Sequence, residues 1–161
     1  MDLYVIRHAD AVPLGERGIT EDADRPLSEA GEKQARALGK GLAKRGIVFD
    51  KVATSPYPRA RQTAELMLKA WTPEPELVTC DDLVPDGKPK GVGRFLRGLK
   101  GERIAVVGHM PQLGDLTAWI IGGKKARIDL AKAGVAHVYS SEEVRKGSGT
   151  LVWLVTSEWF E

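Results

Sequence analysis

The sequence of 161 residues has little of what disulfide or metal chemistry needs. It contains one cysteine, Cys80, so no disulfide forms within the chain and no CxxC pair is available for zinc or for dithiol exchange. Its three histidines are scattered and lack the spacing with carboxylates that is typical of metal sites. We therefore expect neither a metal nor another cofactor. A lone cysteine also fits a reducing compartment.

Long apolar runs and a strong charge of one sign are also missing. Lys and Arg number 24 against 22 Asp and Glu, and this net charge of +2 is too small to indicate a nucleic-acid partner. No apolar stretch approaches the roughly 20 residues that span a bilayer. The first seven residues lack the basic region and the apolar length of a signal peptide. These absences predict a cytoplasmic protein with no nucleic-acid and no membrane partner.

What is present is the composition of one globular domain. Hydrophobic residues make up 42% and charged residues 29%, and the length suits a single domain over 1–161 with its own core. Short runs with β-branched residues alternate with segments of helical periodicity. The predicted strands lie near 3–6, 51–54, 77–79 and 104–107, and the predicted helices near 28–46, 60–71, 92–99 and 113–120. This alternation predicts a three-layer α/β fold, a mostly parallel central sheet with helices on both faces.

The C-terminal part follows a different pattern. Two predicted strands, near 135–139 and 151–155, are joined by a polar stretch with no helix between them. Adjacent strands without a crossover are expected to pair antiparallel. In the first predicted helix, Ser28 is the expected N-cap and Gly46 the expected C-terminal glycine.

Cationic and imidazole side chains follow three of the predicted strands. Arg7 and His8 come after the first strand, Arg59 lies just past the second, and His109 follows the strand over 104–107. Ligand sites of such sheets lie at the carboxyl ends of the strands, so we expect these residues at one edge. Guanidinium groups match phosphoryl oxygens, and arginines lower the pKa of a neighbouring histidine, which leaves it nucleophilic near pH 7. The cluster predicts phosphoryl-transfer chemistry.

The motifs around these residues resemble those of the histidine phosphatase superfamily (phosphoglycerate mutase-like). Arg7-His8-Ala9-Asp10 is similar to its RHG motif, with alanine in the place of glycine. The run from Ser55 to Ala64 resembles the second motif, in which an arginine precedes Ala-x-Gln-Thr-Ala, and Val107-Gly108-His109 resembles the third. The small size, Arg25-Pro26-Leu27-Ser28 and His109-Met110-Pro111 resemble the SixA branch, the phosphohistidine phosphatases.

The resemblance covers nearly the whole chain and implies a role for each motif residue. In this resemblance His8 takes up the phosphoryl group, and the resulting phosphohistidine is then hydrolysed. Arg7, Arg59 and His109 hold the phosphoryl oxygens and stabilise the transition state. The implied partner is a phosphorylated protein, for example a histidine-phosphorylated signalling domain, or a small phosphorylated metabolite.

Two other functions remain open from the sequence. One is a phosphomonoesterase that acts on a small phosphorylated metabolite, although a mutase with lid segments finds little room in 161 residues. The other is a module that binds an anion or a phosphoprotein without turnover. An intact set of Arg7, His8, Arg59 and His109 argues against the second.

The role of Arg25 is also open. It lies on the loop before the first helix, close to the expected site, and is a candidate substrate-binding residue. The alternative is an ion pair with Asp22 or Asp24 that shapes the loop.

No acid that would protonate a leaving group stands in a distinctive motif. Asp10, Asp81 and Asp82 are the candidates. Because the P–N bond of phosphohistidine is labile and imidazole takes up a proton readily, the lack of such an acid favours a phosphoramidate substrate.

Three further residues have structural interpretations. His137 has no motif around it and is expected to be structural or at the surface. Arg61 is expected on the exposed side of a helix, paired with an acid. Cys80 is expected to pack as a small apolar side chain.

Overall fold

Six strands form one sheet in the order β3-β2-β4-β1-β5-β6 in the computed structural model, which describes residues 1–161. The parallel strands are β1 (Asp2–Arg7), β2 (Lys51–Thr54), β3 (Glu76–Thr79) and β4 (Arg103–Gly108). The antiparallel strands are β5 (Val135–Ser140), which pairs with β1, and β6 (Gly149–Val155), which pairs with β5. The mostly parallel sheet and its antiparallel C-terminal pair are confirmed.

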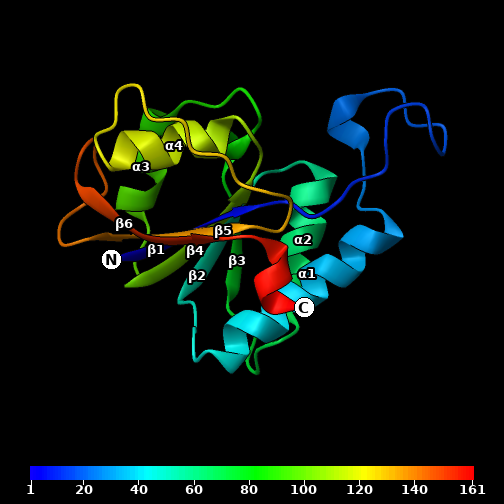
Figure 1. The fold of residues 1–161 in the computed structure, drawn as a ribbon, viewed down its shortest axis with the longest axis horizontal. Coiled ribbons are helices and arrows are strands. Elements are labelled where there is room, and N and C mark those ends of the chain that lie inside the picture. Colours follow the sequence, from blue (N-terminus) through cyan, green and yellow to red (C-terminus); the bar gives the residue numbers. More distant parts are fainter.

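Four α-helices cover the two faces of this sheet. They are α1 (Glu29–Lys44), α2 (Pro58–Leu68), α3 (Pro89–Gly98) and α4 (Gln112–Ile120), with short 3₁₀ turns η1 (Asp22–Asp24), η2 (Asp81–Leu83) and η3 (Ser157–Phe160). Figure 1 shows α3 and α4 on one side of the sheet and α1 and α2 on the other, which confirms three layers. None of the helices combines the length and the apolar character needed to cross a membrane.

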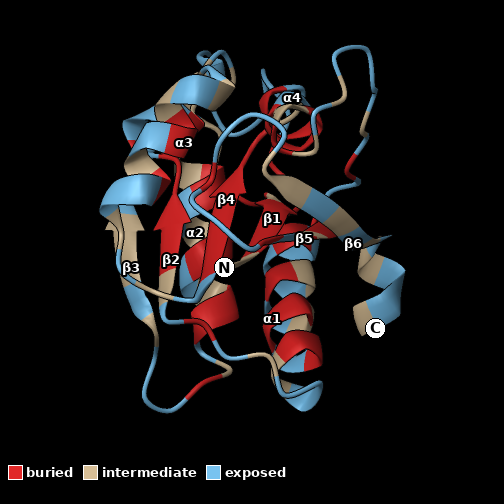
Figure 2. Cartoon of the chain, turned by 90° about the vertical axis from the view of Figure 1, so that its left-hand side faces the viewer, coloured by how far each residue is buried: buried red, intermediate tan, exposed pale blue.

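The sheet has a separate hydrophobic core on each face, as the alternation of side chains along β1 illustrates. Tyr4 and Ile6 belong to the core beneath α1 and α2, whereas Leu3 and Val5 belong to the core beneath α3 and α4. A strand that is buried on both faces has a continuous apolar sequence, which explains the run from Leu3 to Ile6. Figure 2 shows the buried residues gathered in the middle strands and on the inner sides of the helices.

The boundaries of α1 follow the sequence signatures closely. The Ser28 side chain accepts a hydrogen bond from the backbone N–H of Gly31, and Gly46 has a left-handed φ of +73°. At Gly31 the helix packs so closely on the backbone oxygen of Asp10 that a Cβ would collide with it. This contact fixes α1 against the segment that follows β1.

One predicted boundary is wrong. The helix expected to reach Trp71 ends at Leu68, and a turn carries the chain on to Trp71. Trp71 is still buried, because its ring packs against Phe49 and its Nε1 donates to the carbonyl of Ile47 at 2.9 Å. Because Trp71 is buried in the core, it continues the helical spacing of apolar residues in the sequence past Leu68, where the helix ends.

Candidate active site

The register of three neighbouring strands sets the position of the site. Strand β4 lies between β1 and β2, with Gly108 opposite Arg7 and Val107 opposite Thr54. The next residues along the three strands, His8, Ser55 and His109, therefore leave the sheet at the same edge. The backbone of each neighbour is tied to β4, since His8 N donates to Gly108 O and Ser55 N donates to Val107 O, both at 2.9 Å.

His8, Arg59 and His109 converge at this edge, as the sequence predicts. The ring centroids of the two histidines lie 5.1 Å apart. Arg59, in the first turn of α2, places its Nε 3.3 Å from Nε2 of His8. Arg59 is 4% exposed, His8 6% and His109 1%, so the three groups meet inside the protein and none is an ordinary surface residue.

The hydrogen bonds of His8 define which of its nitrogens is free to react. Nδ1 lies 2.7 Å from the carbonyl oxygen of Ala9. Because a carbonyl oxygen only accepts, Nδ1 carries the proton and Nε2 keeps its lone pair. The nitrogen that faces Arg59 is therefore the one with an available lone pair.

Both histidines are held in the neutral form. Burial lowers the pKa of His8 to about 4; the hydrogen bond to Ala9 opposes this shift, and the charges of Arg59 and Arg7 add to it. Burial, His8 and Arg59 lower the pKa of His109 to about 3. At pH 7 the site therefore combines fixed guanidinium charges with two uncharged imidazoles.

Arg7 contributes a donor that has no acceptor in the protein. Its Nη1 donates to the backbone oxygen of Leu130 at 2.8 Å, whereas its Nε is buried and has no hydrogen-bond partner. Nδ1 of His109 is also buried without a partner. Buried polar groups are nearly always satisfied, so two unsatisfied nitrogens on neighbouring strand ends indicate a place for ligand oxygens.

Asp22 contacts two arginines, and the sequence suggested only one of them, Arg25, as its partner. Its Oδ2 lies 3.0 Å from Nη2 of Arg59, its Oδ1 lies 3.0 Å from Nη1 of Arg25, and its backbone oxygen accepts from Nη1 of Arg59 at 2.7 Å. Burial acts to raise the pKa of Asp22, but the hydrogen bond to Arg25 and the charge of Arg59 outweigh it and lower the pKa. Asp22 is thus an ionised bridge between two arginines.

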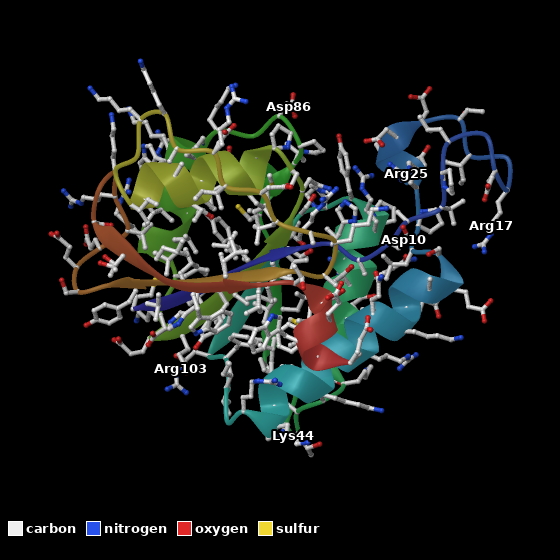
Figure 3. All side chains as sticks on the ribbon, viewed as in Figure 1. Asp10, Arg17, Arg25, Lys44, Asp86 and Arg103 are labelled. Carbon is white, nitrogen blue, oxygen red and sulfur yellow. The ribbon has the colours of Figure 1, made fainter.

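Arg25 pairs with Asp22, one of the two alternatives that the sequence left open, while its Nε donates to the backbone oxygen of Val12 at 2.8 Å. Figure 3 shows Arg25 closer to the sheet than Arg17, which lies at the outer end of the same segment. Arg25 is thereby connected to Arg59 through one carboxylate. Its contact with substrate remains a prediction.

Two further residues of the second motif touch the cluster, although no role was predicted for them. The Oγ of Ser55 lies 2.8 Å from Nε2 of His109. The ring of Tyr57 lies 5.2 Å from the ring of His109 and 5.3 Å from the guanidinium carbon of Arg59. Both residues lie in the second motif of the sequence, but their contacts with His109 and Arg59 depend on how α2 packs against the end of β4.

The three candidate acids lie outside this cluster. Asp10 binds Nζ of Lys132 and the hydroxyl of Ser28, each at 2.6 Å, and these contacts lower its pKa. The carboxylate of Asp82 packs against the backbone of Gly91 in α3, and Asp81 is exposed. None of the three forms a hydrogen bond or ion pair with His8, Arg59 or His109.

The residues expected to be structural behave as predicted. His137 lies 2.7 Å from Asp2, and Nε of Arg61 lies 3.0 Å from Glu65. Cys80 is buried, and burial raises the pKa of its thiol to about 11.

Ala9, which replaces the glycine of the first motif, is fully buried in the core beneath α1 and α2. No three His, Cys, Asp or Glu side chains gather into a possible metal site.

Several known proteins are similar to this chain in both sequence and fold. The sequence model of the histidine phosphatase superfamily (branch 1) matches residues 3–84, a range that contains His8 and Arg59. An uncharacterized protein of Picosynechococcus is 32% identical over 98% of this chain and 96% of its own length. The phosphohistidine phosphatase SixA of Escherichia coli is 28% identical over 95% of this chain and 92% of its own.

Among solved structures, the protein histidine phosphatase SixA complexed with tungstate covers 100% of both chains, with a TM-score of 0.87 and 24% identity. A putative α-ribazole-5'-P phosphatase from Escherichia coli has the same fold, with a TM-score of 0.71, 21% identity and coverage of 98% of this chain and 97% of its own. The matches to these two relatives cover 98% and 95% of the chain, so they extend well beyond residues 3–84. The chain belongs to the histidine phosphatase superfamily and is of the SixA type.

Proposed function

We propose that this protein is a phosphatase that removes a phosphoryl group from a histidine of a phosphorylated protein. It does so by transferring the group to Nε2 of His8. The observation that carries the proposal is the state of His8. Its protonated Nδ1 is anchored to Ala9, and its Nε2 lone pair lies beside the Nε–H of Arg59. With a pKa of about 4, the ring is neutral and nucleophilic at pH 7.

In the first step, Nε2 of His8 attacks phosphorus and the bond from phosphorus to the substrate nitrogen breaks. The leaving imidazole nitrogen takes up a proton from solvent and departs as neutral imidazole. In the second step, water attacks the phosphoryl group on His8 and the P–N bond to Nε2 breaks. Inorganic phosphate leaves, and His8 regains its lone pair while Nδ1 keeps its proton throughout.

Charge stabilisation comes from donors that are already in place. The Nε–H of Arg59 shifts from Nε2 of His8 to a phosphoryl oxygen when the substrate enters. Nε of Arg7 has no acceptor in the free protein and donates to another oxygen. Such preorganised donors stabilise the spread of negative charge in phosphoryl transfer without reorganisation.

The acids of the site favour a nitrogen leaving group. Asp22 is the carboxylate that bonds to Arg59, but its two arginine partners keep it ionised, so it holds no proton to give. Asp10 binds Lys132 and Ser28, Asp82 packs against Gly91, and Asp81 is exposed and forms no hydrogen bond or ion pair with the cluster. An alkyl phosphate needs a proton at its leaving oxygen, whereas an imidazole leaves readily from a phosphoramidate.

The relative from Escherichia coli named a phosphohistidine phosphatase, similar over nearly the full length, supports the same substrate class. We therefore take a histidine-phosphorylated protein in the cytoplasm as the substrate, and residues 1–161 as one catalytic domain. Arg25, linked to the site through Asp22, is in place to contact the substrate as well.

A substrate panel tests the proposal. A phosphohistidine peptide, phosphoserine and phosphotyrosine peptides and a sugar phosphate are compared by kcat/KM, and the acid-quenched enzyme is analysed for phosphate on His8. We expect the highest kcat/KM for phosphohistidine and an acid-labile phosphate that maps to His8.

Two results would contradict parts of this proposal. A sugar phosphate that outperforms phosphohistidine, together with a loss of about 10²-fold on Asp81→Asn or Asp82→Asn, would identify an acid and favour a metabolite phosphatase. Binding of phosphopeptide without turnover or phosphoenzyme would leave only an anion-binding module.

A further inference from the structure

Ser55 and His109 form a buried pair that the proposed reaction does not yet use. Ser55 is fully buried, and its Oγ lies 2.8 Å from Nε2 of His109. Each residue directly follows a strand, β2 and β4 respectively, and these two strands pair in parallel register. The contact is thus fixed by the sheet itself and does not depend on a loop.

The hydrogen bonds of the Ser55 hydroxyl decide where its proton goes. Oγ accepts a hydrogen bond from the backbone N–H of Tyr57 at 3.2 Å. Its only other partner is Nε2 of His109, so the single hydroxyl proton has Nε2 as its acceptor. The reverse arrangement, with a proton on Nε2, would leave both the hydroxyl proton and the Nδ1 lone pair unsatisfied.

A neutral imidazole has only one N–H, so an Nε2 that accepts implies a proton on Nδ1. That Nδ1 is buried and has no partner in the protein. The ring to which it belongs lies 5.1 Å from the ring of His8, centroid to centroid. The protein supplies no acceptor for this N–H, and the oxygens of a phosphoryl group beside His8 are acceptors of the kind it needs.

We infer that Ser55 is a positioning residue: its hydroxyl fixes the Nδ1–H tautomer of His109, so that His109 donates a hydrogen bond from Nδ1 to the phosphoryl group. This inference deepens the proposed function and rests on it for the identity of the ligand. Without the hydroxyl, His109 is free to place its proton on Nε2, and the donor toward the phosphoryl oxygen becomes an electron pair that repels it.

Nitrogen NMR of the histidine side chains at pH 7 tests the tautomer directly, with the His109 signals assigned by their loss in His109→Gln. In the wild type we expect a protonated Nδ1, an unprotonated Nε2 and a shift of the Nδ1–H signal when tungstate, a tetrahedral oxyanion, is added. Ser55→Ala should mix the two tautomers and lower kcat by about 10- to 10²-fold with little change in KM. This is less than the loss of about 10²- to 10³-fold when an oxyanion donor is removed outright, because part of the population keeps the Nδ1–H tautomer.

Ser55→Thr keeps the hydroxyl and should restore both the tautomer and most of kcat. The matched control is Thr117→Val, which removes another buried hydroxyl, one that donates to Leu113 O within α4 at 2.8 Å. It should change neither readout.

A wild-type His109 protonated on Nε2, or a folded Ser55→Ala with wild-type tautomer and kcat, would overturn the inference. The wild-type spectrum decides the tautomer even where a variant does not fold. Because the tautomer is measured in the free protein, an absent His8 phosphoenzyme would defeat the proposed function and not the assignment of Ser55.

Discussion

The three histidines of this protein occupy two kinds of environment. His137, on β5, stacks on Tyr4 with 4.5 Å between ring centroids, and its Nε2 lies 2.7 Å from a carboxylate oxygen of Asp2. His8 and His109 lie at the other end of the parallel strands, among arginines and without a direct carboxylate partner.

The difference shows that the groups around a histidine decide whether its role is structural or chemical. The carboxylate of Asp2 and the ring of Tyr4 both contact the imidazole of His137, so this histidine links β5 to β1. Arginines beside a buried imidazole disfavour its protonation, and a lone pair then remains available for chemistry. Nδ1 of His137 also lacks a hydrogen-bond partner, but it belongs to a ring that packs between Tyr4 and Trp153, whereas the unsatisfied Nε of Arg7 and Nδ1 of His109 lie on neighbouring strand ends among arginines.

Removing one histidine from each environment should give the largest difference in activity. His8→Ala should lower kcat by at least about 10³-fold, as loss of a covalent nucleophile does, and should abolish the trapped phosphoenzyme. His137→Gln should keep near-normal kcat and lose only stability, measured by thermal unfolding. Near-normal turnover in His8→Ala would refute the nucleophile.

Two arginines of α2, two residues apart, provide the next test. Arg59→Ala should lower kcat by about 10²- to 10³-fold, because a buried donor beside the reacting nitrogen is lost. Arg61→Ala removes the same charge from the solvent side, where Arg61 pairs with Glu65, and should leave kcat unchanged. Steady-state kinetics of both variants provide the measurement, and an equal loss in the two would mean that only net charge matters.

The bridge between Arg25 and Arg59 should have a smaller effect. Asp22→Ala removes the carboxylate that holds the end of the Arg59 guanidinium, and we expect a loss of about 10-fold in kcat/KM from the misplaced donor. Asp24 lies in the same 3₁₀ turn and forms no bond with Arg59, so Asp24→Ala serves as the control. Full activity in Asp22→Ala would show that Arg59 is held by its surroundings alone.

The pH dependence provides the finest distinction. The nucleophile is active when neutral, so kcat/KM should fall only as the pH drops through the His8 pKa of about 4. An unperturbed histidine, with a pKa of about 6.5, would already lose about 90% of its activity at pH 5.5. We expect kcat/KM at pH 5.5 to remain close to its value at pH 7. A midpoint near 6.5 would show that His8 is not desolvated in solution.

Much of the fold and the centre of the site follow from local sequence. The apolar runs of β1 and β4 predict buried parallel strands, and Ser28 and Gly46 predict both ends of α1. Since parallel strands end at one edge, Arg7, His8, Arg59 and His109 can be expected together from the order of the elements alone. The end of α2 was misjudged, because Trp71 returns to the core beyond the helix.

The layered α/β fold, the edge that carries the site and the residues that reach it could thus be predicted from the sequence, because they depend on periodicity and chain order. The partners of those residues become known only from the folded molecule. The bond from Asp22 to Arg59 joins positions 37 apart, and that from Ser55 to His109 joins positions 54 apart. Such contacts depend on strand register and on how α2 and the η1 segment pack at one edge. A local sequence pattern contains neither quantity.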